Sequence, residues 1–326
     1  MQSKLRTPRL VVALAAGSLA LSSIGQRAVA ETYPDRPNRF VVPFSAGGGG
    51  DYIARALLGK LSEYLGQPLI IENRGVGNTV VGTNAVAKSP PDGYTILLVN
   101  PQFASNPSLQ PNLPYRTPED FQPVALIMSY AMHLFANSKV PLNSIPELID
   151  HAKKTPGALN YGSAGVGSSG HIAGELFKKM TGTDIVHIPY NGAGPAANGV
   201  IGGHVQLLFT GMSQLQGAMD SGLVKLLGAG CSERNKTPVK TICEQGVPGF
   251  ESLVWWAVLA PAGTPKPIVA KLNEAFRHAA ADPEIQKRFA VIDGDSSVST
   301  PDGLDKLVRS EMAKLSTMTW AAPTPQ

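Results

Sequence analysis

The sequence predicts an α/β protein with two units, each a mostly parallel sheet flanked by helices. Short apolar segments alternate with amphipathic segments of helical periodicity along most of the chain. At two places, near residues 45 and 165, a strand-like segment leads through a glycine-rich turn directly into a helical pattern. Alternation of strands and helices favours right-handed crossovers and parallel sheets. The recurrence of the glycine turn indicates two units of this kind.

The first thirty residues are expected to form a secretory signal peptide and to lie outside the fold. Basic residues precede an uncharged stretch from 10 to 25, and Ala28-Val29-Ala30 gives a small-x-small pattern before Glu31. An uncleaved membrane anchor is the alternative, but the stretch is short for a span and contains Gly and Ser. We therefore expect an exported, periplasmic protein that does not itself span a membrane.

Charge excludes several classes of partner once this leader is set aside. Residues 1–30 hold four basic side chains and no acid, so the rest of the chain has 24 Lys and Arg against 24 Asp and Glu. The basic character of the full sequence thus belongs to the leader. It gives no argument for binding nucleic acid or an anionic membrane surface.

The segment from Arg39 to Glu63 is read as a strand, a glycine turn and a helix. Four consecutive glycines follow the apolar strand, and Asp51 stands at the expected N-cap position of the helix. Glycines allow backbone N–H groups to converge, and the helix N-terminus adds a positive field, so the pattern favours an anion site. A flexible turn before a capped helix is the alternative. The candidate ligand-binding residues here are Phe44, Ser45, Gly48, Gly49 and Asp51.

Two further strands, 68–72 and 94–99, extend the first sheet, and 94–99 is apolar throughout its core, as in buried parallel strands. Asn100 follows the last of them, at the edge where ligand-facing loops lie in open α/β sheets, and is a further candidate. A proline-rich stretch then runs to Pro123.

The chain is expected to cross between the two units twice. An apolar segment at 124–135 leaves the first unit, and 255–261 returns to it. Two crossings predict a hinge with a cleft. We assign residues 31–133 plus 254–326 to domain 1 and residues 134–253 to domain 2.

The segment from Gly162 to His171 repeats the strand, turn and helix pattern. Its glycines fit G-x-G-x-x-G, but the preceding strand is short and polar and no acid follows at a strand end, so an anion site is favoured over a dinucleotide site. Serine hydroxyls add donors to the backbone N–H groups. A serine hydrolase is the enzymatic alternative; because no G-x-S-x-G occurs, His171 is interpreted as a cap or helix residue. The candidates in this unit are Ser163, Gly165, Gly167, Ser168, His171, Tyr190, Asn191, Gly192 and Thr210.

The positions of the cysteines and histidines indicate whether a disulfide or a metal site is to be expected. Cys231 and Cys243 are the only two cysteines, and in an oxidising compartment they are expected to form a disulfide; two buried free thiols are the alternative. The histidines are scattered without metal-ligand spacing, so we expect no metal and no cofactor.

Ordered motifs along the chain resemble the Bug-type solute-binding receptors of tripartite tricarboxylate transporters. The resemblance runs from about Tyr33 to the last helix and rests on PFSAGGGGD at 43–51, ENRG at 72–75, PDGY at 91–94, GSAG at 162–165, HIPY at 187–190, PGFE at 248–251 and LAPAGTP at 259–265.

The resemblance implies a two-domain periplasmic-binding-protein (type II) fold without enzymatic activity. Such a receptor closes on a small organic carboxylate and passes it to the membrane subunits of the transporter. The resemblance further implies that the loops 44–51 and 163–168 hold the carboxylate and that 190–192 forms a third ligand-facing loop. We expect a monomer.

Two departures from the family pattern bear on the ligand. Members often carry Asp at the positions of Gly199 and Thr210, so this chain lacks a partner for a ligand amino group. The expected ligand is a neutral-tailed mono- or dicarboxylate, aromatic ones included, and not an amino acid. A role as the ligand-occupancy sensor of a membrane signalling protein stays open, because it would use the same closed surface.

Overall fold

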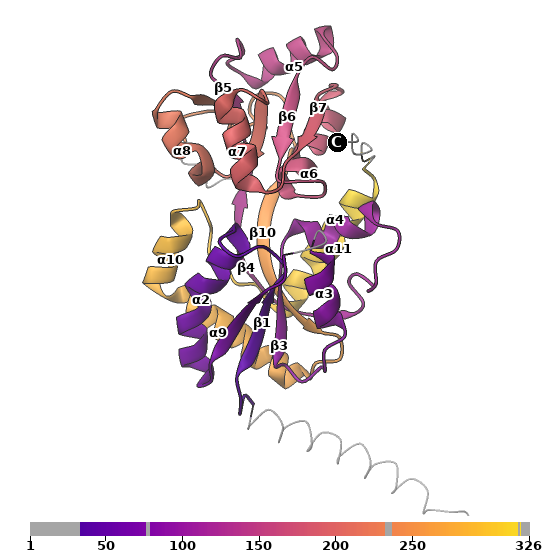
Figure 1. Ribbon diagram of the computed structural model, residues 1–326, viewed down its shortest axis with the longest axis vertical. Helices are drawn as coiled ribbons and strands as arrows, with labels where there is room; N and C mark the ends of the chain where they lie inside the picture. The colour runs from indigo at the N-terminus through magenta and orange to yellow at the C-terminus, as the bar shows by residue number, and fades with distance from the viewer. Residues whose placement is uncertain (1–32, 76–78, 232–236, 319, 321–326) are drawn as a thin grey trace, which may run out of the picture.

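The computed structural model describes residues 33–75, 79–231, 237–318 and 320. It is a mixed α/β protein with two five-stranded sheets, ordered β2-β1-β3-β10-β4 and β7-β6-β8-β5-β9. Figure 1 shows the sheets as separate units along the long axis of the molecule. The expected leader, residues 1–30, lies outside the described residues.

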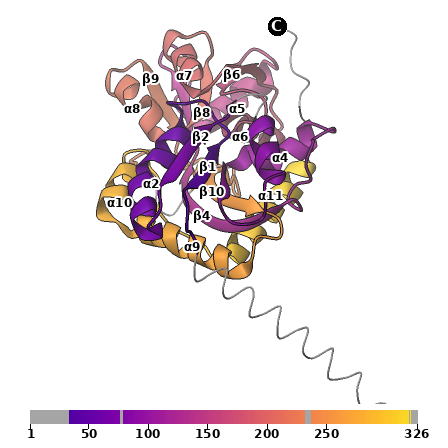
Figure 2. The ribbon, with the colours of Figure 1, turned by 60° about the horizontal axis from the view of Figure 1, so that its bottom comes forward.

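The first sheet contains β1 (Asn38–Val42), β2 (Leu69–Asn73), β3 (Thr95–Val99), β4 (Phe121–Ala131) and β10 (Leu253–Pro261). β1 pairs in parallel with β2 and β3, whereas β10 is antiparallel to both of its neighbours. Four strands therefore run in one direction. The helices α2 (Gly49–Leu65), α9 (Lys266–Ala281) and α10 (Pro283–Ala290) lie on one side, and α3 (Val80–Ala87), α4 (Pro101–Leu109) and α11 (Pro301–Ser316) on the other (Figures 1 and 2).

The second sheet repeats this plan with β5 (His133–Asn137), β6 (Asn160–Ser163), β7 (Val186–Pro189), β8 (Leu207–Thr210) and β9 (Val224–Gly228). Here β5 is the antiparallel strand, and the other four share a direction. Its helices are α5 (Ile145–Lys154), α6 (Ser169–Thr181), α7 (Ala193–Gly202) and α8 (Met212–Asp220).

The strand expected within 124–135 is two strands, which belong to different sheets. β4 ends at Ala131 and β5 begins at His133, so the chain passes from one sheet to the other through Met132. It returns at β10, beside this point, where the Met132 N–H donates to the Ser252 carbonyl at 3.0 Å. The predicted double crossing is therefore present in the sheet topology.

Alternation along β5 divides the core of the second unit. Leu134 and Ala136 belong to a hydrophobic cluster that is continuous with the core of the first unit, whereas Phe135 belongs to a separate cluster with Val200 and Leu215. Successive side chains of a strand point to opposite faces. One face of the second sheet is thus packed continuously with the first unit, and the α7 and α8 face forms its own core.

Candidate ligand-binding site

Helices α2, α6, α7 and α8 each begin just after the carboxyl end of a parallel strand, which is the ligand edge of an open α/β sheet. The N-cap residues of α2, α7 and α8 are Gly48, Gly192 and Gly211, and none provides a side-chain cap. Elsewhere Ser144, Asp282 and Thr300 cap α5, α10 and α11, whereas α3 and α9 also lack a side-chain cap. The first N–H groups of a helix have no acceptor within the helix. Three helix starts are therefore left available to an external anion.

Asp51 is not the N-cap of α2, contrary to the sequence-based prediction. The helix begins two residues earlier, and the Asp51 carboxylate accepts from the Gly47 N–H and the Arg55 guanidinium, both at 2.9 Å. Arg55, opposed by burial and helped by the Gly47 N–H, lowers the pKa of Asp51. Asp51 is almost fully buried. It thus stabilises the glycine turn, in which Gly47 has φ +77°.

The first loop packs tightly beneath its glycines. The Phe44 ring lies edge-to-face on Trp256, with 5.2 Å between centroids. A Cβ on Gly50 would lie 2.6 Å from Phe44, and one on Gly75 would lie 2.3 Å from the Ser45 backbone nitrogen. The Gly48 N–H donates to the Ser45 carbonyl, so it closes the turn. The free donors of this loop are consequently the N–H groups at the start of α2, from Gly49 onward.

The second loop uses part of its predicted donor set internally. The Gly165 N–H donates to the Ser163 hydroxyl at 3.1 Å, and the Gly167 N–H donates to His171 Nδ1 at 3.0 Å. Ser168 is the N-cap of α6 and accepts from the His171 N–H. The fully buried His171 side chain, in α6, thus holds the Gly167 backbone of this loop in place. The N–H groups at the start of α6 and the serine hydroxyl remain suited to an anion.

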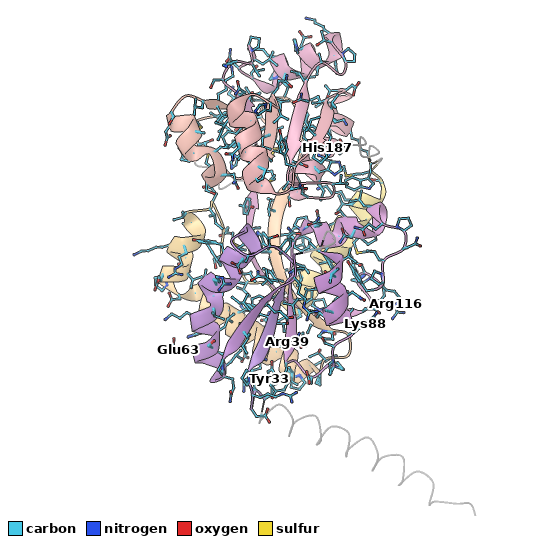
Figure 3. All side chains as sticks on the ribbon, viewed as in Figure 1. Tyr33, Arg39, Glu63, Lys88, Arg116 and His187 are labelled. Atoms are coloured by element: carbon cyan, nitrogen blue, oxygen red, sulfur yellow. A yellow bond between two sulfur atoms is a disulfide. The ribbon has the colours of Figure 1, made fainter. Side chains whose placement is uncertain are left out.

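A stack of rings supports this second loop. His187 lies 4.2 Å from His171 and 4.9 Å from Tyr161 between ring centroids, and its Nε2 is 2.7 Å from the Ser163 hydroxyl. Figure 3 labels His187 in the unit that holds β6 and β7. Burial lowers the pKa of His171 to about 4 and that of His187 to about 3. Lys178 also disfavours protonation of both rings, and His171 disfavours protonation of His187. Both imidazoles are neutral at pH 7.

We expect the free energy of unfolding to fall as the pH drops from about 6.5 toward 4. Because the folded-state pKa values lie below the ordinary value of about 6.5, the unfolded chain binds protons first and is favoured by acid. The stabilisation is complete above pH 6.5; at pH 5 the loss for His171 alone is about 2 kcal/mol. Denaturant titrations at pH 7.5, 6.5, 5.5 and 5.0 measure it. Replacing His171 and His187 by Asn should flatten the slope, while His278→Asn, at an exposed position, should keep it. An unchanged slope in the double variant would contradict this assignment.

Tyr190 lies over α7 at Gly199. A Cβ on Gly199 would be 2.4 Å from the Tyr190 hydroxyl oxygen, and one on Gly162 would be 3.3 Å from the ring. The Tyr190 N–H donates to the Ser163 carbonyl at 2.9 Å, which ties the third loop to the second. The phenol therefore occupies the space that an acidic side chain at position 199 would need. Asn191 beside it is exposed, and Gly192, with φ +118°, begins α7.

Contacts between the two units bring the predicted loops together. Asn100 caps α4 by accepting from the Gln102 N–H, and from the same helix the Ser105 hydroxyl donates to the Gly167 carbonyl at 3.1 Å. Thr210 ends β8 opposite His133, and a Cβ on the following Gly211 would lie 3.0 Å from Tyr130 of β4. The second loop and the end of β8 therefore border the first unit, at a junction between the two units.

Several residues around this junction were not among the predicted site residues: Ser105, Tyr130, His187 and Trp256. His187 was identified only as part of the HIPY motif at 187–190. Tyr130 and Trp256 were identified only as parts of the apolar segments 124–135 and 255–261. Their roles depend on contacts between segments far apart in the chain, for which no local pattern exists.

Other expectations concern metals, thiols and the membrane. Cys231 and Cys243 form a disulfide, as predicted. Among the described residues, no group of three or more His, Cys, Asp or Glu side chains is arranged to hold a metal ion. Nor does any helix in the described part of the chain have the length and apolar character needed to cross a membrane.

Residues 53–320 match the model of a family described as "Tripartite tricarboxylate transporter family receptor". The chain belongs to this receptor family. It is similar to protein BugT of Bordetella pertussis, with 35% identity over 300 residues that cover 91% of this chain and 92% of BugT. A protein of Pseudomonas sp. strain P51, from the tcbD-tcbE intergenic region, is 33% identical over 91% of this chain and 90% of its own.

Solved receptors of similar sequence share the two-unit fold. The periplasmic binding protein BugD is 32% identical with a TM-score of 0.75, covering 87% of this chain and 96% of BugD. Rpa4515 of R. palustris, solved with adipate, is 31% identical with a TM-score of 0.78, covering 88% of this chain and 99% of that protein. MatC of Rhodopseudomonas palustris, with bound malate, is also 31% identical with a TM-score of 0.78, covering 87% and 99%. This is the two-domain periplasmic-binding-protein fold, and the family is one of solute-binding receptors.

Proposed function

We propose that this receptor captures a small organic carboxylate between its two domains, closes on it and delivers it to the membrane subunits of a tripartite tricarboxylate-type transporter. The observation that carries the proposal is a set of helix starts without side-chain caps around the junction between the two units. Helix α2 belongs to the first unit, and α7 and α8 belong to the second. Such helix starts suit an anion and involve no cationic side chain. The ligands of Rpa4515 and MatC, adipate and malate, support a carboxylate.

The proposed closure of the two domains follows from the positions of the backbone N–H donors, which lie in both of them. N–H groups of one sheet alone would leave much of a carboxylate unpaired as it loses water, whereas donors from both sheets compensate that loss together. A ligand that is better paired in the closed form shifts the population toward it. We place the domains at residues 31–133 plus 254–326 and 134–253, and the protein, as a monomer, in the periplasm.

The test is thermal melting of the chain from Glu31 to Gln326 against aliphatic and aromatic mono-, di- and tricarboxylates, with amino acids and sugars alongside. A ligand at a hundred times its dissociation constant adds about 2.7 kcal/mol of apparent stability, which gives a readily visible shift. Shifts confined to certain carboxylates are expected. A response only to sugars, amino acids or esters would overturn the proposal.

A further inference from the structure

Two aromatic side chains, Tyr130 and Trp256, lie on one face of the first sheet beside the junction. Tyr130 of β4 is in register with Val254 of β10, and Trp256 is in register with Met128. Diagonal neighbours of this kind in an antiparallel pair share a face of the sheet and are within reach of each other when the side chains are large. Trp255, one residue earlier, points to the opposite face.

The pair contacts helix starts from both units. A Cβ on Gly50, in the first turn of α2, would lie 3.0 Å from the Trp256 ring, and Phe44 packs on the same indole. On the other side, a Cβ on Gly211, the N-cap of α8, would lie 3.0 Å from the Tyr130 ring. The two side chains therefore form a floor between two of the helix starts proposed to bind the carboxylate.

The floor carries a buried donor without a well-placed acceptor. Trp256 is 6% exposed, and its indole nitrogen makes no hydrogen bond of normal geometry with any described residue. It approaches the Tyr130 hydroxyl closely enough to oppose, in part, the rise that burial causes in the pKa of Tyr130, which reaches about 12. A buried N–H without an acceptor is costly, and a ligand atom that accepts from it would remove that cost.

Charge at the floor disfavours a second anion. The segment that carries Asp293 lies beside β4, because Asp295 bridges to Ser129 and a Cβ on Gly294 would meet the Met128 side chain. The Asp293 carboxylate is therefore near this end of the junction, where it favours the protonated forms of Tyr130 and His133. The His133 Nδ1 accepts from the Gly230 N–H at 3.1 Å, and burial lowers the pKa of His133, so both features disfavour a protonated imidazole. A neutral acceptor suits these surroundings better than a carboxylate does.

We propose that Tyr130 and Trp256 form the specificity subsite for the end of the ligand remote from its carboxylate, and that they select a neutral tail carrying a hydrogen-bond acceptor. The tail lies against the rings of Phe44 and Trp256, and its carbonyl, ether or hydroxyl oxygen accepts from the indole N–H. This inference rests on the proposed function and narrows it to monocarboxylates with an apolar or aromatic body.

Isothermal titration with matched probes tests the subsite. Benzoate has no distal acceptor, 4-methoxybenzoate has a neutral one and terephthalate has a second carboxylate; pentanoate, 4-oxopentanoate and glutarate form the aliphatic series. In at least one series the probe with the neutral acceptor, 4-methoxybenzoate or 4-oxopentanoate, should bind at least tenfold more tightly than the other two probes of that series. Trp256→Phe should cost the neutral-acceptor probe about tenfold more affinity than it costs the acceptor-free probe. Tyr130→Phe should act in the same direction.

Trp255→Phe is the matched control, because it is the same substitution on the neighbouring residue of the opposite face; it should leave the preference unchanged. Equal losses for both kinds of probe in Trp256→Phe, or tightest binding of the second-carboxylate probes, would overturn the subsite while the proposed function stands. If no probe and no other carboxylate binds, the proposed function falls, and the subsite with it.

Discussion

Gly165→Val is expected to weaken carboxylate binding at least a hundredfold while the protein stays folded. Gly165 has φ +122°, a conformation that a β-branched residue adopts only with strain of about 1–3 kcal/mol. Its N–H and carbonyl both bond within the loop, to the Ser163 hydroxyl and from the Ser168 N–H. A shift at this residue therefore displaces the donors at the start of α6. Calorimetric titration with the carboxylate that gives the largest melting shift measures the loss.

Variants at two other glycines distinguish an effect on the second loop from a general loss of stability. Gly222 has φ +70° in the turn between α8 and β9, and an added Cβ would have no neighbour within 4 Å, so Gly222→Val carries comparable backbone strain away from the junction. It should lower the melting temperature without changing affinity. Gly48 has φ −81°, which other residues adopt freely, but a Cβ there would lie 3.1 Å from the Ser45 carbonyl oxygen. Gly48→Val should therefore weaken binding, and by less than Gly165→Val. Wild-type affinity in Gly165→Val would refute the role assigned to this loop.

The sequence allowed prediction of those parts of the structure that depend on local patterns. Apolar runs and glycine turns located the strand, turn and helix units that begin at β1 and β6, because each signal lies within about ten neighbouring residues. The start of α2 was misplaced since consecutive glycines have no side chains to mark which of them is the N-cap. Helix α4 was not predicted, because the segment after Asn100 was read as part of a proline-rich stretch. Pro101 stands in the first turn of the helix, where proline is compatible with helical structure, whereas Pro107 lies inside it.

The sequence predicted which loops form the candidate site, but not which residues of those loops contact one another or the rest of the protein. His171 was interpreted as a cap or helix residue, and the structure shows it bonded to the Gly167 N–H, which removes a donor that the pattern had left for the ligand. Tyr130 meets Trp256 and Gly211 only because β4, β10 and β8 come together where the chain crosses between sheets. Such encounters are set by topology, and periodicity along one segment contains no information on them.

Gly199→Ala is expected to reduce carboxylate affinity about tenfold through Tyr190. The new Cβ would lie 2.4 Å from the Tyr190 hydroxyl oxygen and 2.6 Å from the carbon that bears it, so the phenol must leave its place on α7. Because the Tyr190 backbone is hydrogen-bonded to Ser163, the movement is transmitted to the second loop. A change at a position without a predicted ligand contact would thereby alter binding.

A double-mutant cycle with Tyr190→Ala isolates this contact. When the phenol is already absent, Gly199→Ala meets no obstacle and should change the dissociation constant by less than twofold, so the two substitutions are strongly non-additive. Titration of all four proteins with one carboxylate gives the coupling, and melting temperatures exclude loss of folded protein as the cause. Equal effects of Gly199→Ala in both backgrounds would show that Tyr190 does not mediate it. The expected coupling would instead explain glycine at this position, because the residue leaves room for the Tyr190 phenol on α7.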